Sequence, residues 1–237
     1  MSKISVIIPT FNRFKSLLRS IQSVKTQTYD NIEIIVVNDC STEQDYYSYD
    51  FKDVQIIHLK ENSKQKFGFA CAGGYQRNIG IDIASGDYIS FLDDDDIWFP
   101  NKLELQINAM LKTNCEMSCT DGLHGCGIYD DQKVYPKYNA EKHLNTIRNK
   151  FIKAGSSLMD HGYPDTWTLD FLRVHNCCIV SSVVITRNLF DKVGDFVIKN
   201  RAEDYNYWLR ALHHTDCVYV KDICMYYDDW RAGGKLY

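Results

Sequence analysis

The chain has 237 residues, of which 45% are hydrophobic, and a formal net charge of −4. This composition can bury the core of one large α/β domain or of two small ones, and the negative charge excludes a general attraction for nucleic acid. No apolar run approaches the ~18–20 residues of a membrane span, and the sequence enters a strand after Met1 without a secretory signal. Nine cysteines are expected to stay reduced, so the sequence predicts a cytoplasmic protein.

The first sixty residues alternate short β-favouring runs with one amphipathic helix. Leu17, Leu18, Ile21 and Val24 recur at helical spacing and predict a helix over residues 16–26. Three strands are expected, at residues 5–9, 33–37 and 54–59. This order predicts βαβ units and a mostly parallel sheet flanked by helices.

The next segments connect these strands to the centre of the chain. Residues 45–50 carry three tyrosines and predict an amphipathic surface segment. Residues 62–74 are polar, basic and contain glycine, which predicts a mobile loop. Residues 75–84 predict a helix with Ile79 and Ile83 facing inward.

The central stretch, residues 86–96, predicts a buried strand that ends in four consecutive carboxylates, Asp93 to Asp96. A solvated acidic turn is the usual interpretation of such a run. Here the run directly follows a hydrophobic strand, at the end where open α/β sheets bind ligands. Hard oxygen ligands suit Mg²⁺ or Mn²⁺, so a cation site is the favoured interpretation.

The second half is expected to continue the same domain, because no linker, repeat or low-complexity tract interrupts it. Pro100 opens a helix with Leu103, Ile107, Met110 and Leu111 on one face. Residues 163–171 are expected to form an aromatic loop. The remaining expected elements are strands at residues 115–120, 127–134, 183–186, 218–220 and 223–227, and helices at residues 141–153, 187–194 and 203–214.

Four residues suggest a zinc cluster at first sight: Cys115, Cys119, His124 and Cys126. Their spacing fits no standard zinc template, and the first two lie in a strand-like run. We therefore expect ordinary buried thiols there.

Several motifs, in order, resemble those of the family 2 glycosyltransferases. Residues 5–13, Ser-Val-Ile-Ile-Pro-Thr-Phe-Asn-Arg, resemble the opening motif of that family, and residues 38–42 are similar to its Asp-Asp-Gly-Ser-Thr turn. Residues 77–96 look like its central block, and residues 181–210 look like its late block. The resemblance implies a GT-A fold over one domain, residues 1–237. In that fold residues 1–100 would bind the nucleotide and residues 101–237 the acceptor.

The resemblance also implies the roles of individual residues. The general base would be Asp204, with Glu203 as the reserve choice. Asp95 would contact the metal, Mn²⁺ or Mg²⁺. The nucleotide would be held by Pro9, Thr10, Asn12, Arg13, Asp39, Arg77, Asp93 and Asp94. The implied reaction is inverting transfer of a sugar, with a UDP-sugar favoured, to a hydroxyl of a glycan, protein or small molecule.

Two departures from the family pattern concern the same site. Asn38 and Cys40 stand where the turn usually has Asp and Gly, and no histidine follows residue 214 as a late metal ligand. The sequence stops soon after the late block, which suggests that it is the catalytic piece of a longer protein. For Arg77 a surface ion pair with Asp82 or Asp87 is the alternative to nucleotide contact.

Other classes of protein remain as alternatives. A nucleotidyltransferase that forms nucleotide sugars wants a glycine-rich loop after the first strand, and residues 10–13 have no glycine. A non-catalytic nucleotide or sugar binder would be favoured by loss of the acidic residues, which are present. A receiver-type signalling domain is normally much shorter. The sugar, the acceptor and the oligomeric state stay open.

Overall fold

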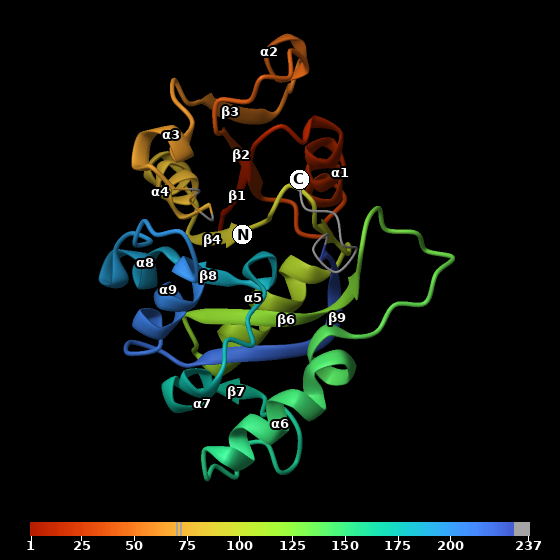
Figure 1. Ribbon diagram of the computed structural model, residues 1–237, viewed down its shortest axis with the longest axis vertical. Helices are drawn as coiled ribbons and strands as arrows, with labels where there is room; N and C mark the ends of the chain where they lie inside the picture. Colours follow the sequence, from red (N-terminus) through yellow and green to blue (C-terminus); the bar gives the residue numbers. More distant parts are fainter. Residues whose placement is uncertain (70, 72, 230–237) are drawn as a thin grey trace.

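The computed structural model describes residues 1–69, 71 and 73–229 (Figure 1). Within these residues one mixed sheet runs through the whole molecule in the order β3-β2-β1-β4-β8-β6-β9-β5, and β7 pairs with β9. The strands are β1 Ile4–Thr10, β2 Ile32–Asn38, β3 Val54–His58, β4 Tyr88–Phe91, β5 Ile97–Trp98, β6 Met117–Gly125, β7 Thr166–Trp167, β8 Val184–Thr186 and β9 Cys217–Asp228.

Helices cover both faces of this sheet. The α-helices are α1 Phe14–Lys25, α2 Asp45–Ser48, α3 Ser63–Phe67, α4 Gly74–Ile83, α5 Lys102–Thr113, α6 Leu144–Lys153, α7 Leu169–Val174, α8 Arg187–Val193 and α9 Glu203–Ala211. A π-helical turn, Tyr138–His143, precedes α6, and a 3₁₀ turn, Val180–Ser182, precedes β8.

The parallel pairings are the long ones. β1 pairs with β2 along its whole length and with β4 over residues 4–7, and β6 pairs with β9 in parallel over most of its length. The antiparallel pairings of β8 with β4 and β6, and of β9 with β5 and β7, are short. The expected α/β class with a largely parallel sheet is therefore confirmed.

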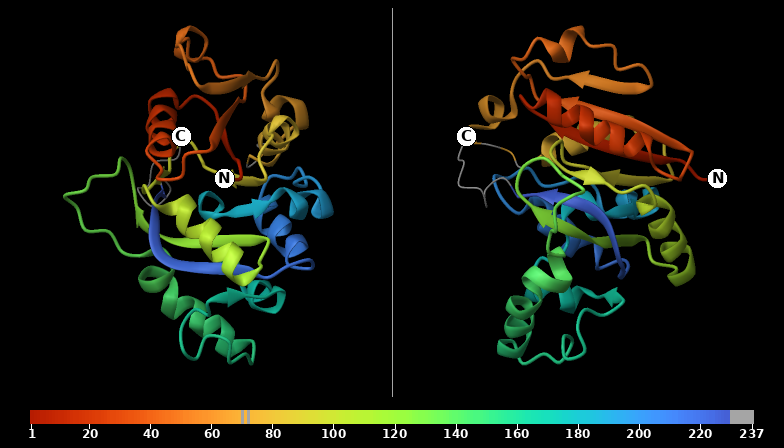
Figure 2. Two further views of the ribbon diagram at one scale, coloured as in Figure 1. Left: turned by 180° about the vertical axis from the view of Figure 1, so that it is seen from behind. Right: turned by 90° about the vertical axis from the view of Figure 1, so that its right-hand side faces the viewer.

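Alternation along β1 divides the core into two layers. Ile4, Val6 and Ile8 point to the face covered by α1 and α5, whereas Ile7 points to the face covered by α4. Figure 2 shows α1 and α4 on opposite sides of the first strands. The second layer continues under α6, α7, α8 and α9, so a single sheet carries both halves of the chain.

The expected inward face of α4 is wrong. Ile83 is exposed and Ile79 only half-buried, while the buried side chains of the helix include Gln76, Arg77 and Asn78. Apolar periodicity finds a face that packs on the core, but this helix turns a polar face inward. The reason is that Gln76 and Arg77 line a cavity, while the Asn78 side chain bonds to the backbone of Phe196.

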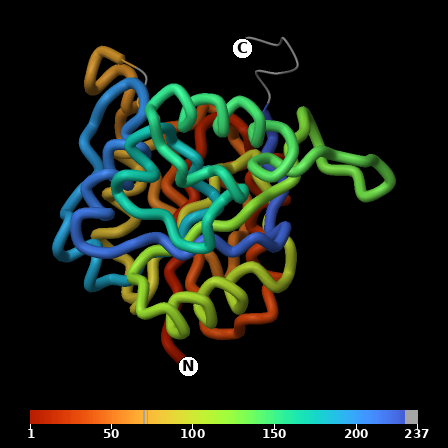
Figure 3. Tube along the Cα trace, turned by 90° about the horizontal axis from the view of Figure 1, so that it is seen from below, coloured from red at the N-terminus to blue at the C-terminus, as the bar shows by residue number. Residues whose placement is uncertain are grey.

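One expected loop and one expected strand are also corrected. Residues 62–74 contain the short helix α3, capped by the Asn62 side chain, which accepts a hydrogen bond from the Lys64 amide. Residues 127–134 form no strand; the segment projects from the body between β6 and α6 (Figures 1 and 3). Leu111 is exposed rather than on the buried face of α5.

The last elements of the chain are of the expected type, but their lengths differ from those expected. The two late strands expected at residues 218–227 form one strand, β9, and α9 ends at Ala211 instead of residue 214. Residues 163–171, expected as a loop, contain β7 and the start of α7, and their aromatic side chains are buried. None of the helices in the described part of the chain is long and apolar enough to cross a bilayer.

Candidate active site

Two adjoining cavities lie where the parallel strands end. The first, of about 520 Å³, lies at the carboxyl ends of β1, β2 and β4; the second, of about 650 Å³, lies at the start of α9. They share Arg77, Asp93 and Tyr227 in their walls. Sequence-predicted residues in the first are Pro9, Thr10, Arg13, Asp39, Arg77, Asp93, Asp94 and Asp95, and Glu203 and Asp204 line the second.

The acidic run after β4 points two carboxylates toward one arginine. Asp94 is buried and accepts hydrogen bonds from Thr10 Oγ1 at 2.7 Å and from Arg13 Nη1 at 3.1 Å. The same Arg13 nitrogen lies 2.5 Å from Asp95 Oδ2. Burial and repulsion by Asp94 still raise the pKa of Asp95 to about 8. Two carboxylates of the acidic run thus share the single guanidinium group of Arg13.

Asp96 is fully buried rather than solvated. Its Oδ1 accepts a hydrogen bond at 2.9 Å from the backbone amide of Asp228, at the end of β9. This bond ties the last strand to the acidic run, and Asp228 lines the first cavity as a result. Burial and repulsion by Asp95 raise the pKa of Asp96 well above its usual range.

Asp39 lies at the end of β2 in a cradle made by the segment before α3. Its carboxylate accepts hydrogen bonds from the Ser63 amide at 2.8 Å, the Ser63 hydroxyl at 2.7 Å and the Asn62 side chain at 3.0 Å. Two of these go to Oδ2 and one to Oδ1, so Oδ1 keeps the capacity to accept one more. Burial raises the pKa of Asp39, and the Ser63 bonds oppose that rise.

The loops after β1 and β2 hold each other in a left-handed conformation. Asn12 and Cys40 have φ values of 50° and 58°. Asn12 Oδ1 accepts a hydrogen bond from the Thr42 amide at 2.7 Å, and the Asn12 amide donates to Ser41 Oγ at 2.9 Å. The structure therefore places Asn12 between the two loops and outside the wall of the first cavity.

Arg77 is a buried bridge rather than a surface cation. Only 2% of its side chain is exposed, and it donates to Asp93 at 2.6 Å and to Glu203 at 3.1 Å. These contacts connect α4, the acidic run and the start of α9. The alternative pairing with Asp82 or Asp87 does not occur among the ion pairs of the described residues.

The two carboxylates that open α9 have different surroundings. Glu203 is buried and held by Arg77, whereas Asp204 is only half-buried and accepts from its neighbouring Tyr205 amide at 2.7 Å. Burial raises the pKa of Asp204, which the Tyr205 amide and Arg77 oppose. Burial therefore outweighs the contacts that favour the ionised form of Asp204.

The backbone before these carboxylates is strained. Ala202, the residue that precedes α9, has φ 52° and ψ 33°, in the left-handed region that side chains with a Cβ rarely adopt. It sets the direction in which the helix starts. The start of α9 lies beside Asn176, whose Nδ2 reaches Asp204 Oδ2 at 3.5 Å.

Several residues of the site were not predicted from the sequence. Ser63 and Asn62 fell in a stretch expected to be a loop, and Asn176 lies in a segment for which no element was expected. Asp228 could have been predicted, because it follows the strand expected at residues 223–227, just as Asp39 and Asp93 follow expected strands; in the structure it is the last residue of β9. The suggested zinc cluster does not form: within the described residues Cys115, His124 and Cys126 join no group of three potential metal ligands.

The fold and these cavities define a class: a single-sheet α/β protein whose acidic cavity lies at the carboxyl ends of parallel strands, where such sheets bind ligands. The chain belongs to glycosyl transferase family 2, because the sequence model of that family matches residues 5–163.

Named relatives of this chain are bacterial glycosyltransferases. It is 33% identical over 212 residues to Escherichia coli WfgD, a UDP-Glc:alpha-D-GlcNAc-diphosphoundecaprenol beta-1,3-glucosyltransferase, covering 88% of this chain and 69% of WfgD. It is 36% identical over 228 residues to TuaG of Bacillus subtilis, a putative teichuronic acid biosynthesis glycosyltransferase, covering 94% of this chain and 77% of TuaG. The chain spans a much smaller share of other relatives. It is 44% identical over 121 residues to an uncharacterized glycosyltransferase of Rickettsia bellii, and this match covers 50% of this chain and 16% of that protein.

Solved structures share the fold. The S. aureus TarS structure of residues 1–349 superimposes with a TM-score of 0.63 at 20% identity, covering 95% of this chain and 60% of that one. TarS has also been solved in complex with UDP and with UDP-GlcNAc. This likeness confirms the expected GT-A fold.

Proposed function

We propose that this chain transfers a sugar from a nucleoside diphosphate sugar, with UDP favoured, to an acceptor hydroxyl with inversion and with the help of a divalent cation. The observation that carries the proposal is the pair of cavities that meet at Arg77 and Asp93. One is lined by the carboxylates of the strand ends and the other by Asp204. Such a transfer needs a donor and an acceptor held in line across one short gap.

The first cavity suits the donor nucleotide. Asp39 Oδ1 has room for one further hydrogen bond, which the imide N–H of uracil would fill. Thr10 is held in the wall of the same cavity by Asp94 and Tyr46. The TarS complexes contain UDP and UDP-GlcNAc, and WfgD is named for UDP-Glc, which supports a uridine donor here.

The residues present fit a divalent cation. The donors are hard carboxylate oxygens: Asp93, Asp94, Asp95 and Asp228 line one cavity, and Arg13 pairs with two of them. Among the described residues no three carboxylates bring oxygens within 4.8 Å of one another, which suits an ion that takes its remaining ligands from phosphate and water. Asp95 would hold the ion, with Asp228 beside it in the same wall. When bound, Mn²⁺ or Mg²⁺ neutralises charge on the diphosphate leaving group.

The second cavity suits the acceptor, and Asp204 is the better placed of the two carboxylates to take its proton. Burial raises the pKa of both carboxylates, but Glu203 is buried and held by Arg77, whereas Asp204 is the less buried of the two. A carboxylate of raised pKa is a stronger base while still ionised near neutral pH. Asn176 contacts Asp204 and would help to orient it.

A donor screen tests the proposal. Release of nucleoside diphosphate from UDP-, GDP- and dTDP-sugars is measured with Mn²⁺ and with excess chelator, in wild type and in Asp95→Ala. We expect release from a UDP-sugar with Mn²⁺, and none with chelator or in Asp95→Ala. The matched control is Asp131→Ala on the projecting loop. Release from GDP-sugars alone, or full release with chelator, contradicts the donor or the metal assignment.

A further inference from the structure

Three buried cysteines from three distant segments meet in the core. Cys119 lies on β6, Cys217 on β9, and Cys178 in the segment between α7 and the turn at residues 180–182. Their sulfur atoms all lie within 4.8 Å of one another, which makes this group one of three potential metal ligands. Cys119 and Cys217 have no exposed surface and Cys178 has 6%.

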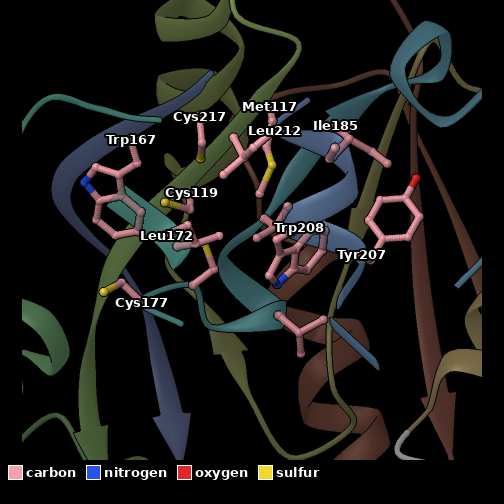
Figure 4. Close-up of a cluster of buried hydrophobic side chains, with 14 of the residues drawn as sticks. Met117, Cys119, Trp167, Leu172, Cys177, Ile185, Tyr207, Trp208, Leu212 and Cys217 are labelled. Atoms are coloured by element: carbon pink, nitrogen blue, oxygen red, sulfur yellow. The ribbon is translucent and has the colours of Figure 1, made fainter. Parts of the chain in front are cut away.

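Strand register explains why two of them face each other. In the parallel pair of β6 and β9, Met117 stands opposite Cys217 and Cys119 opposite Tyr219. Side chains two residues apart on a strand share a face, so Cys119 and Cys217 are diagonal neighbours. Figure 4 shows both among apolar side chains, with Cys177 lying apart from them.

The surroundings of the cluster are dry and apolar. Met117, Trp167, Leu172 and Trp208 belong to the same core cluster as the three cysteines. Cysteine sulfur is a soft ligand, so a group of three cysteines suits a thiophilic centre.

The summed charge of the three thiolates decides which metal or metalloid ion the site can bind. Three thiolates carry three negative charges, so Zn²⁺ would leave one of them uncompensated and Cu⁺ two, beside Cys119 and Cys217, which have no exposed surface. Structural zinc also takes four ligands, and here only three sulfur atoms gather in the described residues. A trivalent centre bound to three sulfur atoms is neutral, which a dry apolar site favours.

We propose that Cys119, Cys178 and Cys217 form a binding site for a trivalent thiophilic centre, for which arsenite is the probe. Each of the three S–H groups gives its proton to one hydroxyl of As(OH)₃. Three As–S bonds form, three As–O bonds break, and three waters leave. No oxidant or reductant takes part.

The site has an entrance. Cys178 lines the second cavity, so arsenite reaches this thiol from solvent before it meets the two deeper ones. The first As–S bond then holds the centre next to Cys119 and Cys217.

Mass spectrometry of the folded, reduced wild-type protein treated with arsenite tests the proposal. We expect one arsenic per chain with the loss of three protons, and a fall of three in the nine titratable thiols. Loss of only two protons overturns the three-sulfur site, and so does a folded protein that takes up no arsenic. Tighter binding of Zn²⁺ than of arsenite at this site contradicts the charge argument.

Variants identify the ligands. Cys119→Ala, Cys178→Ala and Cys217→Ala should each weaken arsenite binding by at least about tenfold, or about 1.4 kcal/mol. Cys177→Ala and Cys224→Ala are the matched controls, because both remove a buried thiol outside the cluster and should bind as wild type. Binding that depends on Cys177 overturns the assignment. If a variant fails to fold, the proton and thiol counts of the wild type still decide.

Discussion

The left-handed backbone conformation of Cys40 costs free energy, because its side chain has a Cβ atom. Cys40 has φ 58°, at the position where the Asp-Asp-Gly-Ser-Thr turn that residues 38–42 resemble has glycine. The conformation that the turn motif requires is thus kept here although the residue that best adopts it is missing. The Asn38 side chain helps to hold the turn by accepting from the Ser41 amide at 3.0 Å.

Cys40→Gly should therefore stabilise the protein. Relief of the left-handed strain, less the added entropy of the unfolded chain, predicts a gain of about 0.5–1 kcal/mol in the free energy of unfolding. Urea denaturation measures it. Cys126→Gly is the control: Cys126 is exposed and does not have positive φ, so this change should bring no gain. A loss of stability in Cys40→Gly contradicts the interpretation.

At the scale of elements, Arg77 joins α4 and α9 across the acidic run. Its partners Asp93 and Glu203 would face each other without a cation if it were removed. Arg77→Met should cost about 3–5 kcal/mol of unfolding free energy, because the buried carboxylate of Glu203 loses its partner.

A second substitution distinguishes charge from packing in that bridge. In Arg77→Met combined with Glu203→Gln, one buried charge is gone, so part of the lost stability should return. Thermal and urea unfolding of the two single variants and the double variant give the coupling. Strictly additive losses would show that Arg77 acts through packing alone.

Helix α5 carries a lysine, Lys102, that forms no ion pair with an acidic residue in the described part of the chain. Lys102 is fully buried, lies 3.9 Å from the centre of the Trp98 ring and donates to Gln106 Oε1. Burial lowers its pKa to about 7 from 10.5. Between those values the unfolded chain holds a proton that the folded chain has released, so this group makes stability rise with pH across that window.

Lys102→Met should stabilise the protein by about 1–3 kcal/mol below the folded pKa, with a gain that shrinks toward high pH. Urea unfolding at about pH 6.5 and at about pH 9 measures both parts. Lys112→Met, an exposed change on the same helix, is the control and should show little effect at either pH. An equal gain at both pH values would assign the effect to packing instead of charge.

At the scale of the whole molecule, the sequence predicted the first four strands and the edge of the sheet at which the site lies. Apolar runs located β1, β2, β3 and β4, and the polar residues after them met at one edge, because parallel strands end together. The inward face of α4 was missed since it is polar, and the contribution of Ser63 was missed since it depends on a fold-back onto Asp39. The triad of Cys119, Cys178 and Cys217 has no sequence spacing to read, because tertiary packing alone brings it together.

The central claim joins both cavities in one inverting reaction, with Asp204 as its base. Asp204→Asn keeps the size of the side chain and removes its charge, and Glu203→Gln assayed beside it separates the two neighbours. Turnover of a UDP-sugar, UDP affinity and the anomeric configuration of the product are measured together.

We predict an inverted product from the wild type, and in Asp204→Asn a turnover lower by about 10²–10⁴-fold with UDP affinity unchanged. Wild-type turnover in Asp204→Asn, or a product that retains the configuration of the donor, would contradict the account.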